Sequence, residues 1–247
     1  MLGTVIGLTG GVFGGLVGLG GGVVMVPMLV GLAGLRQQEA HGTSLVTVVF
    51  AGMAGAATYA ARGAVDLPGA AFLAVAATLT ARFGARYAHA LPEWKLKRAF
   101  GAFLLAVALL LLAKPWLAGG GAPLAGWGKA AVLLPVGAAT GFLSGMMGVG
   151  GGNLMVPAMV LLAGFPQVIA QGTSLLAMVP AAAVGAHTHW QLGNVARRLV
   201  PGLVAGILVG AFAGGSVALR LPETALRLVF AAVLVWTGIR YLRARRP

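Results

Sequence analysis

The sequence has no cysteine and very few acidic residues, and both absences exclude functions. Without cysteine the chain forms no disulfide, thiolate nucleophile or cysteine-ligated metal site. Only 4 residues are Asp or Glu, and no H-E-x-x-H pattern occurs, so we expect no metal site and no cofactor. Charged residues make up 9% of the chain, against about 25% in typical soluble domains. The low charge argues against a soluble protein.

What is abundant is apolar surface. Of the 247 residues 59% are hydrophobic, and the mean hydropathy is +0.96. These values indicate an integral membrane protein with many helices. The net charge of +13 would also fit nucleic-acid binding. However, the basic residues lie in short gaps between apolar runs, as membrane orientation requires, so we expect a lipid bilayer and no nucleic acid as partner.

The second half of the chain repeats the first at one constant shift, which lays Gly18 on Gly148. The paired stretches are "GLGGGVVMVP" (18–27) with "GVGGGNLMVP" (148–157), "AGLRQQEAHGTSL" (33–45) with "AGFPQVIAQGTSL" (163–175), and "LPE" at 91–93 and 221–223. One shift that holds across separate segments predicts two structural units, a hallmark of transporters. The units are residues 1–117 and 129–247, joined by a Gly-rich linker, 118–128.

Each half contains five apolar segments. They are 2–18, 21–34, 40–61, 67–90 and 96–114 in the first half, and 129–147, 150–164, 167–190, 199–219 and 223–242 in the second. The sequence therefore predicts an all-α polytopic membrane protein built from two repeats of about five segments each.

The basic residues predict that the two repeats are inverted relative to each other. If each Gly-rich hairpin counts as two arms, one side of the membrane receives 12 basic residues and the other 5. The richer side holds Arg36, Arg82, Arg86, Lys95, Lys97, Arg98, Arg197, Arg198, Arg240, Arg243, Arg245 and Arg246. If residues 2–34 cross the membrane as a single helix, one side receives 8 basic residues and the other 9, which gives no preference. The positive-inside rule thus favours inverted repeats with both termini cytoplasmic.

The paired glycine triplets predict a break inside the membrane. The segment from Val23 to Gly34 has 12 residues and spans roughly 18 Å as a helix, against a hydrocarbon core of about 30 Å. We expect broken or re-entrant helix pairs whose turns expose amide groups to an anion. The predicted positions are Gly20, Gly21, Gly22, Gly150, Gly151 and Gly152. Whether the hairpins cross the membrane fully stays open. Close helix packing is the alternative role for the glycines of the triplets. For scattered glycines such as Gly52, Gly55 and Gly210 we expect this packing role.

Polar residues follow each hairpin at matching positions. They are His41, Thr43 and Ser44 in the first half and Gln171, Thr173 and Ser174 in the second. Donors at this depth usually face the bundle interior and mark a substrate path, although hydroxyls also bond to their own helix carbonyls. Asn153 stands where the first half has Val23, so the two halves are not chemically equivalent. His187, His189 and Trp190 end the eighth segment, where we expect an interfacial position.

At these residues the sequence resembles the sulfite exporter family, TauE/SafE. The likeness rests on the doubled Gly motif, the two "GTSL" motifs, and "GNV" (193–195) with its weaker partner "GAV" (63–65). The resemblance implies a transporter of sulfite or an organosulfonate in the bacterial cytoplasmic membrane. It also implies that Gly20–Gly22 and Gly150–Gly152, with the Thr and Ser of both G-T-S motifs, bind the anion.

The expected function is therefore secondary transport of sulfite or a small organosulfonate such as sulfoacetate, in the export direction, by alternating access. A passive anion channel and an uptake carrier for another sulfur oxyanion are the alternatives. A membrane enzyme is not expected, because "GFLSG" (141–145) has the wrong spacing for an intramembrane serine protease. Whether the chain acts alone or as a homodimer stays open.

Overall fold

The computed structural model describes residues 1–87, 93–117, 124–148 and 150–243, and in these ranges the chain forms ten α-helices and no strand. The helices are α1 (Leu2–Val17), α2 (Gly22–Gly31), α3 (Gln37–Ala60), α4 (Leu67–Tyr87), α5 (Glu93–Leu117), α6 (Gly126–Met147), α7 (Gly152–Leu161), α8 (Gln167–Gln191), α9 (Val200–Ala218) and α10 (Glu223–Leu242). This architecture confirms the expected all-α class.

Six of the described helices are long and apolar enough to cross a membrane: α3, α4, α6, α8, α9 and α10. The remaining apolar stretches are shorter, namely α1, α2, α7 and residues 100–113 of α5. The protein is accordingly a multi-pass membrane protein. The short helices α2 and α7, of 10 residues each, would span only about 15 Å.

The helix bounds repeat with the sequence. The shift that lays Gly18 on Gly148 also places α2 directly on α7, and α3 on α8 except at the last residue of α8. The predicted linker is shorter than expected, because α6 begins at Gly126 and residues 126–128 are helical. Residues 118–123 of the linker lie outside the described residues.

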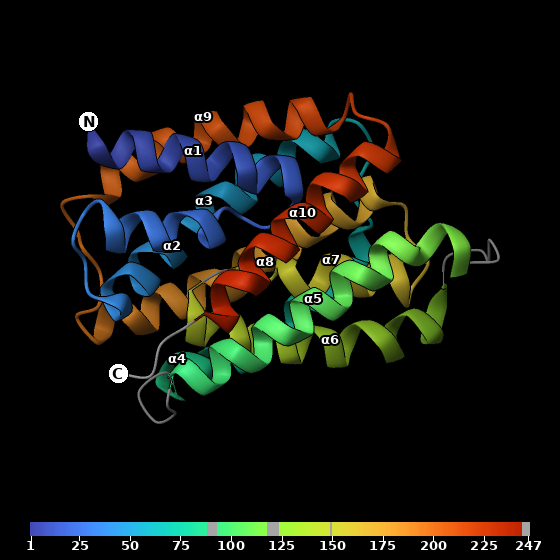
Figure 1. Ribbon diagram of the computed structural model, residues 1–247, viewed down its shortest axis with the longest axis horizontal. Coiled ribbons are helices and arrows are strands. Elements are labelled where there is room, and N and C mark those ends of the chain that lie inside the picture. Colours follow the sequence, from blue (N-terminus) through green and yellow to red (C-terminus); the bar gives the residue numbers. More distant parts are fainter. Residues whose placement is uncertain (88–92, 118–123, 149, 244–247) are drawn as a thin grey trace.

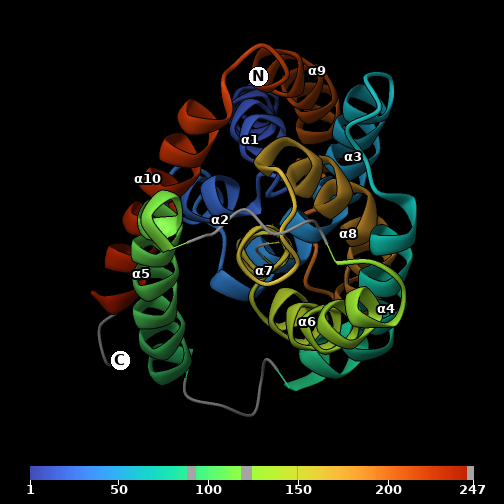
Figure 2. The same ribbon diagram turned by 90° about the vertical axis from the view of Figure 1, so that its right-hand side faces the viewer.

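The two halves pack in an interleaved manner rather than side by side. Helix α1 runs along α9, and its repeat equivalent α6 runs along α4. Two further large contacts join equivalent helices, α3 with α8 and α5 with α10, and α4 also packs on α8. Figure 1 shows α1 beside α9, and Figure 2 shows α5 and α10 as a pair at one side of the bundle with α7 near its centre. Each half therefore depends on the other for its packing.

Glycine allows the α1–α9 pair to approach closely. Gly3, Gly7, Gly11 and Gly15 lie at intervals of four residues on one stripe of α1, and a β-carbon at any of them would crowd the α9 backbone or the residue just before it. The scattered glycines behave as expected: Gly210 packs against the Leu8 carbonyl, and a β-carbon at Gly52 would lie 2.8 Å from the Leu175 carbonyl oxygen. These contacts confirm a packing role for them.

We expect Gly11→Ala to destabilise the protein. Its new β-carbon would lie 2.6 Å from the Ile207 carbonyl oxygen, so α1 and α9 would have to separate. Overpacking of this kind costs about 1–3 kcal/mol. Gly31→Ala is the matched control, because nothing lies within 4 Å of its β-carbon position. Thermal unfolding in detergent measures both, and equal melting temperatures would contradict the packing role of α1.

Both glycine motifs break the chain into hairpins. Helix α1 ends at Val17, and Gly18, Gly20 and Gly21 take left-handed backbone angles (φ of 76°, 72° and 81°) before α2 begins. Gly14 then lies against Gly21, so α2 folds back along α1. Residues 2–34 are therefore two helices joined by a turn, and non-glycine residues rarely adopt such angles.

The second hairpin, α6–α7, has the same form. Gly148 and Gly150 have φ of 64° and 80°. The open end of this hairpin is closed by a hydrogen bond of 3.0 Å from the Leu124 amide to the Ala163 carbonyl. The chain thus returns after α7 to the end of the bundle from which α6 starts.

Candidate functional site

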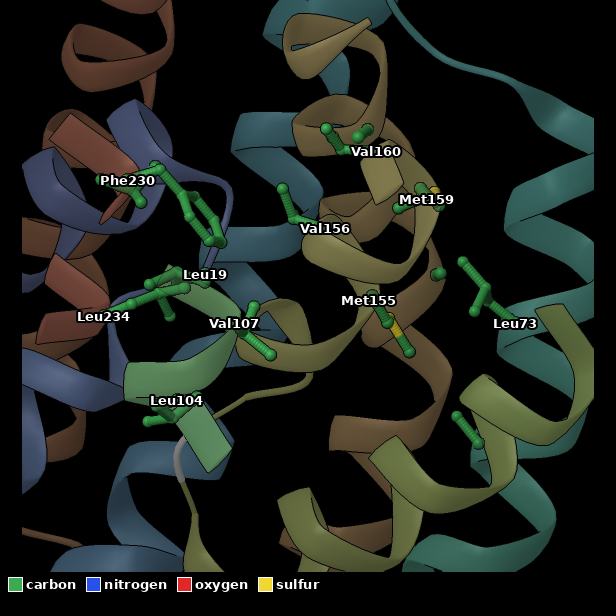
Figure 3. Packing of buried hydrophobic residues seen from close by; sticks show 14 of the residues in the cluster. Leu19, Leu73, Leu104, Val107, Met155, Val156, Met159, Val160, Phe230 and Leu234 are labelled. Atoms are coloured by element: carbon green, nitrogen blue, oxygen red, sulfur yellow. The ribbon is translucent and has the colours of Figure 1, made fainter. Parts of the chain in front are cut away.

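The tips of the two hairpins meet inside the protein. A β-carbon at Gly150 would lie 2.6 Å from the Leu19 carbonyl oxygen, and one at Gly152 would overlap the Gly18 carbonyl. Leu19 is 2% exposed and shares a cluster with Val107, Val156, Phe230 and Leu234, which surround it in Figure 3. Only glycine permits this approach, so the triplets bring two turns and the start of α7 to one central place.

Each turn also rests on the G-T-S helix of the other half. Gly18 packs against Gln171 of α8, where its β-carbon would lie 2.7 Å from Cα. Gly148 packs in the same way against His41 of α3. The Ser174 hydroxyl donates a hydrogen bond of 3.1 Å to the Gly18 carbonyl. The predicted residues from α3 and α8 are thus brought together with the turns.

The threonines of the G-T-S motifs hold loops. Thr43 Oγ1 accepts a hydrogen bond of 2.9 Å from the Ala196 amide, and Thr173 Oγ1 accepts one of 2.9 Å from the Asp66 amide. The glycines that precede these threonines contact the "GNV" and "GAV" motifs, because Gly42 and Gly172 pack against the backbone carbonyls of Asn194 and Ala64. The paired motifs therefore fasten each half to the other, an arrangement that sequence spacing did not predict.

Two buried residues missing from the predicted site also contact the hairpins. Tyr59 Oη lies 2.9 Å from the Gly15 carbonyl and 3.1 Å from Gln171 Oε1. His189 Nε2 lies 3.1 Å from the Gly145 carbonyl oxygen. Because a carbonyl oxygen can only accept a hydrogen bond, Nε2 must be the protonated nitrogen that donates it. His189 is fully buried within the protein, two residues before the end of α8. The repeat shift pairs Tyr59 with His189 and could have identified both.

Unpaired polar atoms gather around the turns. Among the described residues, Ser44 Oγ, Gln171 Nε2 and both polar atoms of the Asn153 amide are buried without a hydrogen-bond partner. The exposed fractions of these three side chains are at most 2%. His41 differs, since its Nε2 lies 3.0 Å from Gln37 Nε2. Buried donors without partners are rare and require an explanation, of which a transient ligand is one.

A cleft opens beside the second turn. It is lined by Phe100, Thr140, Leu143, Ser144, Met147, Gly150, Gly151, Asn153 and Leu154. The space available to the centre of a water molecule is about 10 Å³, enough for roughly one water. The N-terminus of α7 faces this region, and its N-cap, Gly151, has no side chain to pair with the first amides. The site thus offers amide, hydroxyl and helix-dipole donors.

The acidic residues stand at or next to helix starts and not in the cleft. Glu39, Asp66 and Glu223 stand at the starts of α3, α4 and α10, where a negative charge is favourable beside the helix dipole. The fourth acidic residue, Glu93, is the first residue of α5. Asp66 is held in place by Lys129, whose Nζ lies 3.0 Å from both carboxylate oxygens. No acidic residue lines the cleft among the described residues, so an anion would meet no carboxylate there.

The two serines of the G-T-S motifs should respond differently to removal. Ser174→Ala deletes the bond to the Gly18 carbonyl and should destabilise the protein by about 1 kcal/mol. Ser44→Ala removes a buried hydroxyl with no partner, so we expect unchanged or higher stability. Chemical unfolding in detergent checks both, and each variant is the other's control. A larger loss for Ser44→Ala would show that its hydroxyl is bonded in the folded protein.

Comparison with known proteins shows the family of the chain. The family model for sulfite exporter TauE/SafE matches residues 3–241. The chain is 28% identical to the probable membrane transporter protein YunE of Bacillus subtilis, covering 96% of this chain and 95% of that protein. A probable membrane transporter protein of Xylella fastidiosa is 32% identical over 66% of this chain and 64% of its own length. YjnA of Bacillus subtilis, also a probable membrane transporter protein, is 24% identical over 96% of this chain and 97% of its own.

No solved structure matches the chain. The relatives are named as transporters, and the family model spans nearly the whole sequence. The protein is therefore a membrane transporter rather than an enzyme, and it belongs to the sulfite exporter TauE/SafE family.

Proposed function

We propose that the protein exports sulfite or a small organosulfonate such as sulfoacetate across the bacterial cytoplasmic membrane. The family's description names sulfite export, and the observation that carries the proposal here is the unpaired Asn153 amide in the cleft. It stands in the first turn of α7, beside the meeting point of the two hairpins. Neutral donors at a helix N-terminus favour a small oxyanion.

The apolar part of the cleft favours this cargo over sulfate. Phe100, Leu143, Met147 and Leu154 face the same space as Asn153. Such a wall would desolvate one side of the ligand without replacing lost hydrogen bonds. An organosulfonate has a carbon substituent, and sulfite a lone pair, on the side away from its oxygens. Sulfate has oxygens on every side and would lose more hydration.

Alternating access fits the small size of the cleft. Space for roughly one water cannot hold a sulfur oxyanion, so binding requires α6 and α7 to move apart or α5 to withdraw. Helix α5 packs mainly on α10, and this pair packs only lightly on α7, α8 and α1, so withdrawal of α5 and α10 together would disturb few contacts. A rocking of these elements would open the site to each side in turn. We place both termini in the cytoplasm, from the distribution of basic residues.

The direction follows from charge. A membrane that is negative inside favours anion exit by about 2.3 kcal/mol per charge per 100 mV. Export through neutral donors then needs no intramembrane carboxylate for a coupling ion. This agrees with the placement of the acidic residues at helix starts.

Flux into proteoliposomes tests the proposal. We expect labelled sulfite and sulfoacetate to move, sulfate to move more slowly, and an imposed potential to set the direction. Saturation and counter-flow would identify a carrier, and linear flux would identify a channel. Absence of flux for every sulfur anion, with a control transporter active in parallel, would contradict the cargo.

A further inference from the structure

We propose that each chain binds one substrate anion, in the α6–α7 cleft, with Asn153 and Ser144 as direct ligands, and that the equivalent place in the first half is closed. This inference rests on the proposed anion transport and specifies its site. An inverted pair of repeats would otherwise suggest two equivalent sites. The difference between the halves lies in three side chains.

The polar residues of the cleft have apolar equivalents in the first half. The repeat shift pairs Thr140 with Gly10, Ser144 with Gly14, and Asn153 with Val23. Every polar side chain that lines the cleft is therefore absent from α1 and α2 at the matching positions. The glycines of the turns themselves are retained, so the backbone alone does not distinguish the two places.

The glycines that replace Thr140 and Ser144 in the first half also let α1 and α2 pack closely, so the place equivalent to the cleft is closed. A β-carbon at Gly14 would lie 2.5 Å from the Gly21 amide nitrogen, so α1 rests directly on the backbone of its turn. The Met25 side chain fills the space beside Gly10, and Met25 is fully buried. Close packing of this kind leaves no room for a ligand.

In the second half, side chains keep the hairpin apart. Thr140 Cγ2 occupies the space in front of Gly151, at 2.5 Å from where a β-carbon would be. The Thr140 hydroxyl donates to the Val136 carbonyl at 2.6 Å, so this residue acts as a spacer rather than a donor. Ser144, one turn further along α6, lines the cleft, and its hydroxyl has no hydrogen bond within the described part of the chain.

The side-chain donors of the cleft that have no partner within the protein suit a single small oxyanion. Asn153 offers two N–H groups and Ser144 one O–H, and α7 adds the positive end of its dipole. Asn153 is 2% exposed and both its polar atoms are unpaired, so a ligand would satisfy a group that is now buried at a cost. The first half has no such group at residue 23, where valine is buried.

Equilibrium binding of labelled sulfite to the purified full-length chain in detergent tests the inference. We expect one anion per chain. Replacement by the first-half residues, Asn153→Val and Ser144→Gly, should each weaken affinity at least about tenfold. The reciprocal Val23→Asn should create no second site. Thr237→Val is the matched control, because the Thr237 hydroxyl bonds to a carbonyl of its own helix outside the cleft, and it should change affinity less than about threefold. Ser144→Ala replaces Ser144→Gly if the glycine variant unfolds.

The outcomes separate this inference from the proposed function. Two anions per chain, with normal flux, would overturn the single site and leave transport standing. One anion per chain with wild-type affinity in both Asn153→Val and a folded Ser144 variant would overturn the assigned ligands. No bound anion and no flux would overturn the proposed function and, with it, the site.

Discussion

Asn153→Asp should abolish transport while the protein folds normally. The substitution is nearly isosteric, but it puts a carboxylate in the first turn of α7, in the cleft where we place the anion. Two like charges 4 Å apart repel by about 4 kcal/mol at an effective dielectric constant of 20. We therefore expect the affinity for sulfite to fall at least about 100-fold. Equilibrium binding and proteoliposome flux at neutral pH measure this effect.

The fold of this variant should survive because an acidic residue is favourable in the first turn of a helix. Circular dichroism and the melting temperature in detergent verify that the protein is folded. Gln191→Glu is the charge-matched control, since Gln191 is exposed at the end of α8 and its side chain is hydrogen-bonded to His187. It should keep flux within about twofold. Wild-type affinity in Asn153→Asp would exclude an anion at the start of α7.

Gly150→Ala should prevent the two hairpin tips from meeting and should sharply reduce the yield of folded protein. Gly150 has φ of 80°, and its β-carbon would lie 2.6 Å from the Leu19 carbonyl oxygen. The left-handed angle costs a non-glycine residue about 1–2 kcal/mol, and the collision adds about 1–3 kcal/mol. The sum is a large share of a typical folding free energy. Size-exclusion behaviour and thermal unfolding measure the loss.

Gly34→Ala separates the two causes. Gly34 also has a left-handed angle, φ of 67°, but nothing lies within 4 Å of its β-carbon position. This control should therefore show only the backbone penalty. If the two variants lose equal stability, the tips do not need to be in contact, and the central site would have to be relocated.

The packing contacts also limit how the transporter can move. Each hairpin touches the G-T-S helix of the other half, through Gly18 with Gln171 and Gly148 with His41. A hairpin that moves alone would break these contacts across the centre. We therefore expect each hairpin to move together with the helix of the other repeat that it touches.

The local features of this protein could be predicted from the sequence. The helical segments, both breaks and the equivalence of the halves follow from apolar runs, glycine triplets and one constant shift. These features are local because a long apolar run or a glycine at a left-handed angle acts through its immediate neighbours. The same repeat pointed to Ser44, Asn153 and Gln171, which stay predicted donors to the anion.

Only the tertiary structure decided which helices pair and which donors stay unpaired. Nothing in the sequence indicated that α1 lies along α9, or that Thr43 and Thr173 fasten loops of the opposite half. The repeat shift pairs Tyr59 with His189, but their contacts with the hairpins, like the spacer role of Thr140, became visible only in the tertiary structure. Tyr59 and His189 act through contacts between segments that are far apart in the sequence. Sequence periodicity reports which face of a helix is apolar, but the shapes that fit together in space determine its partner.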